Sequence, residues 1–140
     1  METKNIGINV KQPSTTCTDV HCPFHGQLSV RGRQFTGTVI SDRMAKTVTV
    51  EWTEMKQLPK YERFEKRRTK IKVHNPPCMN AKEGDRVRIG ECRPLSKTKH
   101  FVVIENMGKM KGYELFSEAM QESKFKQKKK VEEAAEDVSA

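Results

Sequence analysis

The chain has 140 residues, enough for one domain or for one small domain with extensions. Charged residues make up 32% of it, and 27 basic against 18 acidic residues give a net charge of +9. This charge favours a polyanionic partner, either nucleic acid or an anionic membrane surface. No apolar run approaches the ~20 residues that span a bilayer, and the first residues lack the apolar stretch of a secretory signal. We therefore expect an intracellular, cytoplasmic protein with no membrane partner.

The middle of the chain is predicted to form short β-strands. Residues 35–42 and 46–52 are rich in β-branched side chains with period-2 alternation, and the short link between them predicts a hairpin. Pro76 and Pro77 end a third strand, because proline lacks the N–H that a strand ladder needs. The pattern predicts an all-β fold, a small five-stranded OB-fold-like barrel, with strands at 35–42, 46–52, 69–74, 86–89 and 100–105.

The two ends of the chain differ from this middle part. We expect an irregular N-terminal extension over residues 1–34, the barrel over 35–106, and a charged C-terminal tail over 107–140. Residues 114–130 could form a helix with a ragged apolar stripe, and the last ten or so residues lack core-forming side chains, which is typical of disorder.

Most of the positive charge lies in the middle, where residues 61–104 contain 12 basic and 5 acidic residues. One cluster interleaves five cations with Tyr61 and Phe64: Arg63, Lys66, Arg67, Arg68 and Lys70. A second cluster, residues 93–100, is basic and rich in hydroxyls. We expect two loops at one end of the barrel that bind phosphates through guanidinium and ammonium groups. The alternative is that these are solvated basic loops.

Aromatic residues are scarce, and Phe35, Trp52 and Phe101 are expected in the barrel core. General single-strand binders display a row of exposed stacking rings, which this sequence lacks. The composition therefore favours a folded RNA that is recognised by its shape and backbone.

Four cysteines in a chain without a secretory signal are expected to be reduced thiols. Cys17, Cys22 and His25 have a spacing that would suit three ligands of a tetrahedral, structural zinc ion. The fourth ligand is left open among His21, His74, Cys78 and Cys92. The alternative is a pair of buried thiols beside an incidental histidine, and Cys78 and Cys92 are expected to be small apolar core residues.

No catalytic arrangement is recognisable. The sequence has no nucleophile beside a base, no carboxylate pair in an apolar setting and no glycine-rich phosphate loop. Glu83 and Asp85 flank Gly84 as acidic residues commonly flank turns. We expect neither an enzyme nor a small-molecule substrate.

The run Gly84-Asp-Arg-Val-Arg-Ile-Gly-Glu-Cys-Arg-Pro-Leu-Ser96 resembles the signature of the small-subunit ribosomal protein S-seventeen family. Residues 37–48 and the basic run 61–68 fit the same family, so that the resemblance covers about residues 35–104. Residues 5–8 and 22–32 resemble the extension of archaeal and eukaryotic members rather than bacterial ones, and the cysteine–histidine form looks archaeal. Residues 109–140 go beyond what matches.

The resemblance implies an OB-type barrel that binds small-subunit rRNA directly, in the 5′ domain, and helps its assembly beside other ribosomal proteins. Carried onto this sequence, its RNA-facing residues would be Arg43, Lys46, Arg63, Lys66, Arg67, Arg68, Arg93, Ser96, Lys97, Thr98 and Lys99, and the charge pattern adds Lys70.

Two other functions stay open at this point. One is a zinc-stapled protein–protein adaptor on which the basic face is incidental. The other is a non-ribosomal single-stranded RNA-binding protein of the OB class, which would need exposed rings.

Overall fold

In the computed structural model, residues 4–113 and 118–119 are described. Two compact units divide the chain, Met1–Lys109 and Met110–Ala140, and the first of them contains the fold. Its elements in chain order are β1 (Val30–Met44), β2 (Thr47–Leu58), a 3-10 turn η1 (Pro59–Tyr61), β3 (Arg63–His74), β4 (Asp85–Ser96) and β5 (Lys99–Lys109). The helix expected over residues 114–130 and the tail beyond it lie almost entirely outside the described residues.

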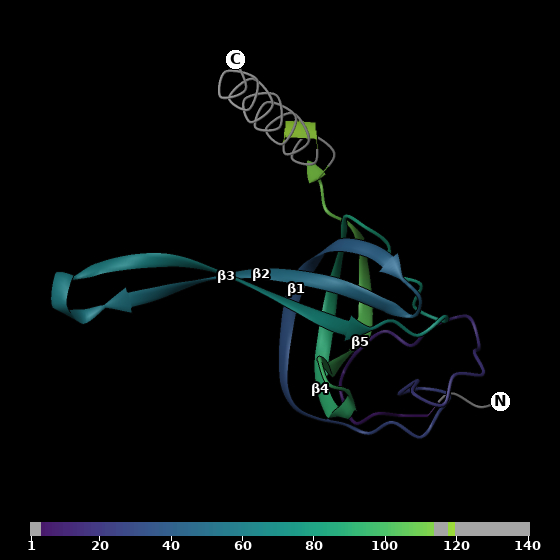
Figure 1. The fold of residues 1–140 in the computed structure, drawn as a ribbon. Coiled ribbons are helices and arrows are strands. Elements are labelled where there is room, and N and C mark those ends of the chain that lie inside the picture. Colours follow the sequence, from purple (N-terminus) through teal and green to yellow (C-terminus); the bar gives the residue numbers. More distant parts are fainter. Residues whose placement is uncertain (1–3, 114–117, 120–140) are drawn as a thin grey trace, which may run out of the picture. The chain divides into compact units, whose positions relative to one another are not determined.

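The five strands form one closed barrel in the order β1-β2-β3-β5-β4 (Figure 1). Strand β1 is long enough to pair with β2 through its second half and with β4 over most of its length. Antiparallel pairing holds throughout except between β3 and β5, which run parallel and close the barrel. The prediction of an all-β, five-stranded OB-type barrel is therefore confirmed.

The strands are longer than the sequence pattern predicted. Residues 63–70 belong to β3 rather than to a basic loop, because each of them pairs with a residue of β2 in unbroken register. Likewise, residues 93–96 lie in β4 and residues 99–100 in β5, which leaves Lys97 and Thr98 as the turn. The expectation of two basic loops is wrong in this respect: both clusters lie mainly on strands.

Beyond the pair formed by Trp52 and Thr69, the hairpin of β2 and β3 runs past the barrel wall (Figure 1). We call residues 53–68 the arm. Nearly every residue in it is exposed, because neither face of this two-stranded ribbon is covered by the barrel. Two open faces also explain why the arm lacks the apolar alternation by which a strand is recognised from sequence.

Small β-branched side chains fill the barrel. Val39, Val48, Val50, Val73 and Val87 are at most 1% exposed, together with Ile89 and Val103. The three expected core aromatics, Phe35, Trp52 and Phe101, are partly buried and pack against this core, and the Phe35 and Trp52 rings stack with centroids 4.7 Å apart.

The N-terminal segment before β1 contains no strand or helix among its described residues, as expected of an irregular extension, but residues 30–34, expected to belong to that extension, lie in β1. It is nevertheless packed against the barrel. Ile6, Ile8 and Val10 cover a cluster formed by the buried residues Leu28, Cys92, Val102 and Ile104. This packing positions the cysteine-containing loop that follows.

Candidate metal centre and nucleic-acid interface

Tight backbone turns position Cys17, Cys22 and His25. The N–H of Cys22 donates to the carbonyl of Asp19 (3.1 Å), and the N–H of Gly26 donates to the carbonyl of Cys22 (3.0 Å). A side chain at position 26 would bring its Cβ within 2.6 Å of the Asp19 carbonyl oxygen, so the loop closes this tightly only around a glycine. The turn places the Cys22 and His25 side chains beside each other.

Cys78 comes from the loop between β3 and β4. The Asn75 side chain makes two hydrogen bonds to the backbone of Ala81, and the N–H of Met79 donates to the carbonyl of Pro76 (3.0 Å). The hydroxyl of Thr15 donates to the carbonyl of Cys78 (3.0 Å), which ties this loop to the N-terminal segment.

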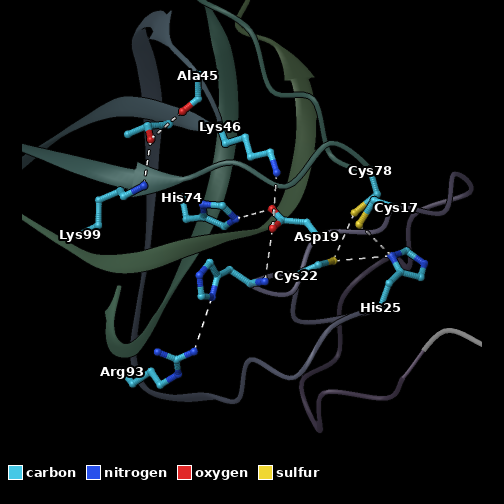
Figure 2. Close-up of polar contacts among 12 residues, drawn as sticks. Cys17, Asp19, Cys22, His25, Ala45, Lys46, His74, Cys78, Arg93 and Lys99 are labelled. Atoms are coloured by element: carbon cyan, nitrogen blue, oxygen red, sulfur yellow. Dashed lines mark hydrogen bonds and ion pairs between the residues drawn. The ribbon is translucent and has the colours of Figure 1, made fainter. Parts of the chain in front are cut away.

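These two loops bring four potential metal ligands together (Figure 2). Nδ1 of His25 lies 3.4 Å from Sγ of Cys17 and 3.6 Å from Sγ of Cys22, which lies 3.6 Å from Sγ of Cys78. All four ligand atoms lie within 4.8 Å of one another. Of the four candidates for the fourth ligand, Cys78 is the one whose sulfur lies in this cluster, and its side chain is also buried, as expected. Cys92 does pack among apolar side chains, as expected.

The chemistry of this Cys3His cluster fits a metal ion. All four cysteines of the chain are free thiols. Around a tetrahedral zinc ion, with Zn–S of ~2.3 Å and Zn–N of ~2.0 Å, neighbouring ligand atoms would lie about 3.5–3.8 Å apart, close to the separations between these side chains. The hydrogen bond from the Cys78 thiol lowers the pKa of Cys22 to about 4, and the same contact raises that of Cys78 above its usual range. The contact therefore favours the thiolate form of Cys22, which is the form that binds a metal ion.

A buried polar pair lies next to the cluster. Nε2–H of His74 donates to Oδ2 of Asp19 (2.8 Å), and both side chains are less than a tenth exposed. Burial lowers the pKa of His74, so the imidazole is neutral at pH 7. Burial also raises the pKa of Asp19, but hydrogen bonds from His74 and from the N–H of His21 outweigh this and leave it below its usual value. Lys46 lies 3.7 Å from the same carboxylate.

The expected RNA-facing residues lie in three places. Arg43 lies near the end of β1 and Lys46 in the turn between β1 and β2, and both are exposed. The arm and its base carry Arg63, Lys66, Arg67, Arg68 and Lys70, all of them exposed. The hairpin of β4 and β5 carries Arg93, Ser96, Lys97, Thr98 and Lys99, of which Lys99 is partly buried.

Several of these residues already have partners within the chain. Arg67 pairs with Glu65 and Lys70 with Glu51, each at 3.3 Å, and the Lys99 ammonium donates to the hydroxyl of Thr47 (3.1 Å). Arg93 lies 3.5 Å from Nδ1 of His21 (Figure 2). Ser96 accepts a hydrogen bond from the N–H of Thr98 (3.4 Å), so it also shapes the turn.

Parallel pairing of β3 and β5 places Lys99 beside Lys72, and this joins the second basic cluster to the base of the arm. Sequence reasoning missed Lys72 as a candidate. The alternation of Lys70 and Lys72 with Ile71 and Val73 already placed the two lysines on one face. It was used only to predict a strand.

Comparisons with known proteins decide the family. A family model described as Ribosomal protein S17 matches residues 37–105. A protein of Methanocaldococcus jannaschii named "Small ribosomal subunit protein uS17" is 54% identical over 79% of this chain and 94% of its own length. The chain belongs to the ribosomal protein S17 family. Proteins of the same name from Methanopyrus kandleri and Methanosphaera stadtmanae are 61% and 58% identical, over 73% and 71% of this chain and 86% and 94% of their own lengths.

Membership of the S17 family confirms the resemblance seen in the sequence, including its archaeal character. Ribosomal proteins are a structural rather than a catalytic class. No helix within the described residues is long and apolar enough to cross a membrane.

Proposed function

We propose that this S17-family chain is a cytoplasmic, structural constituent of the small ribosomal subunit that binds small-subunit rRNA directly. The observation that carries the proposal is the joining of two basic clusters across β3 and β5, where Lys72 lies beside Lys99. Cations from strands that are distant in sequence form one surface, and such a surface suits the phosphates of a folded RNA.

The barrel positions these cations, and the RNA contacts come from the three basic regions. We propose that the contacting residues are the twelve that the sequence singled out: Arg43, Lys46, Arg63, Lys66, Arg67, Arg68, Lys70, Arg93, Ser96, Lys97, Thr98 and Lys99. The names of the relatives support small-subunit rRNA and neighbouring ribosomal proteins as partners. The 5′ domain is the part of the rRNA that we propose as the binding site.

Competition filter binding tests this function. The full chain is titrated with the 5′ domain of its own small-subunit rRNA, against an unrelated folded RNA of equal length, at two salt concentrations. We expect a preference of about a hundredfold that survives the higher salt, because a purely electrostatic contact would weaken equally for both RNAs. Equal affinity for the two RNAs, lost to the same extent at the higher salt concentration, would contradict the proposal and favour a protein–protein adaptor. Preference for unstructured RNA would favour a single-strand binder.

We also propose that the Cys3His cluster holds a structural zinc ion. Cys17, Cys22 and His25 would bind it from the N-terminal loop and Cys78 from the loop after β3, so the ion would cross-link two segments of irregular structure. Three sulfur ligands and one nitrogen ligand favour zinc over magnesium or calcium, which prefer oxygen.

Metal content of the purified chain tests this site, and the two buried cysteines 78 and 92 provide a matched pair. We expect about one zinc per wild-type chain. Cys78→Ser should lose most of it, whereas Cys92→Ser should keep it, because only Cys78 lies in the cluster. Equal metal content in the two variants, or none in the wild type, would contradict the zinc proposal without touching RNA binding.

A further inference from the structure

The two faces of the β2–β3 ribbon differ in charge. Cross-strand partners point to the same face of a sheet, and successive residues point to opposite faces. The register from Thr47↔His74 to Leu58↔Arg63 has no shift, so this rule assigns every residue of the ribbon to one face or the other.

Burial at the barrel end tells which face is which. Val48, Val50 and Val73 are buried in the barrel, so even-numbered residues of β2 and odd-numbered residues of β3 point inward there. The other set points outward, and we call it the outer face. In β3 the outer face carries, at every second position from the arm to the barrel, Phe64, Lys66, Arg68, Lys70 and Lys72.

Charge on the outer face is barely compensated. Along these two strands, which the structure describes in full, four cations share the outer face with one acidic residue, Glu51, which pairs with Lys70 at 3.3 Å. The opposite face carries Lys56, Arg63 and Arg67 together with Glu54 and Glu65. Glu54 lies across from Arg67, which itself pairs with Glu65, so most of the charge on the opposite face is neutralised within the chain.

Exposed apolar side chains also lie on the outer face. Phe64 is 65% exposed and Met55 63% exposed, and they belong to neighbouring cross-strand pairs, with Gln57 and Lys66 respectively. An aromatic ring beside cations, with no acidic residue nearby on the same face, suits a nucleotide base next to its phosphate.

We propose that the outer face of β3, from Phe64 to Lys72, is the RNA-binding surface of the arm. The inference rests on the proposed function and narrows it: Lys66, Arg68 and Lys72 hold phosphates of one rRNA strand, and Phe64 stacks on an unpaired base. Cations at every second residue recur about every 6.6–6.8 Å, a step comparable with that between successive phosphates. Of the twelve residues proposed to contact RNA, Arg63 and Arg67 lie on the opposite face and contribute less to binding than the cations of the outer face.

Two double variants of the full chain test this surface. Lys66→Ala with Arg68→Ala and Arg63→Ala with Arg67→Ala remove the same charge from opposite faces of an exposed ribbon. We expect the first pair to weaken filter binding to the rRNA 5′ domain by roughly tenfold or more, and to flatten the salt slope by about 1–2. The second pair should weaken binding by a few-fold. Phe64→Leu, which changes no charge, should cost about fivefold or more without changing the salt slope.

Circular dichroism and thermal melting confirm folding of each variant. Equal losses from the two double variants, or a larger loss from the Arg63 and Arg67 pair, would overturn the face assignment while leaving the rRNA function intact. If the wild type binds unrelated RNA equally well, the proposed function fails, and the comparison of the double variants still decides which face binds RNA.

Discussion

At the scale of single residues, the buried pair of Asp19 and His74 links the cysteine loop to the end of β3. The imidazole is neutral, so the contact is a hydrogen bond to a carboxylate rather than an ion pair. A buried donor that loses its acceptor has no water to replace it, and the loss is therefore costly. The exposed Lys46 ammonium, near the same carboxylate, remains in contact with solvent.

Asp19→Ala is therefore expected to lower the free energy of unfolding by about 1–3 kcal/mol, because it leaves Nε2–H of His74 buried without an acceptor. Lys46→Ala removes only a 3.7 Å contact made by an exposed ammonium group and leaves the hydrogen bonds of Asp19 in place, so it should cost about 0–1 kcal/mol. Urea unfolding monitored by Trp52 fluorescence measures both. Similar losses from the two variants would show that the buried hydrogen bond contributes little.

Residue-level prediction succeeded where spacing along the chain was sufficient. Cys17, Cys22 and His25 lie within nine residues, and the sequence identified them as a set. Cys78 was one of four candidates for the fourth ligand, and the sequence did not single it out because the loop that carries it reaches the cluster only after β3 has crossed the barrel. A contact between residues so far apart in the sequence cannot be predicted from their spacing. The fourth ligand therefore stayed undecided among four residues.

At the scale of elements, the strands that form the barrel were predictable and their extensions were not. Residues 35–42 and 46–52 alternate because one face is buried. The arm has two exposed faces, so its strands carry no such alternation. Its run of basic residues was therefore interpreted as a loop. Sequence alone does not supply the cross-strand register. This register places Arg67 and Arg68 on opposite faces of the ribbon.

The two loops of the Cys3His cluster should respond together. In Cys22→Ser we expect backbone amides of residues 17–26 and 75–80 to exchange about tenfold faster, equivalent to ~1.4 kcal/mol of local opening free energy. Amides of β2 and β3 inside the barrel should keep their protection, because the buried valines form a cluster separate from the one that contains Cys22. Hydrogen exchange read by mass spectrometry measures this. A uniform increase across the barrel would show that the loops and the core unfold as one unit.

At the scale of the whole molecule, the composition alone predicted a polyanionic partner, and the fold shows how a small domain presents that charge. A barrel filled largely by valines leaves its outer surface free for cations. Like charges held close together repel, and a bound RNA would relieve that repulsion while stabilising the folded chain. Family membership and the basic surface therefore lead to the same partner from independent observations.

The most direct test of this account is hydroxyl-radical footprinting of the full chain on its own small-subunit rRNA. We predict protection of a compact set of backbone positions within the 5′ domain. In the Lys66→Ala, Arg68→Ala variant, the RNA strand that contacts the arm should lose its protection. Protection spread evenly over the RNA, or none at concentrations that saturate filter binding, would contradict a specific rRNA-binding role.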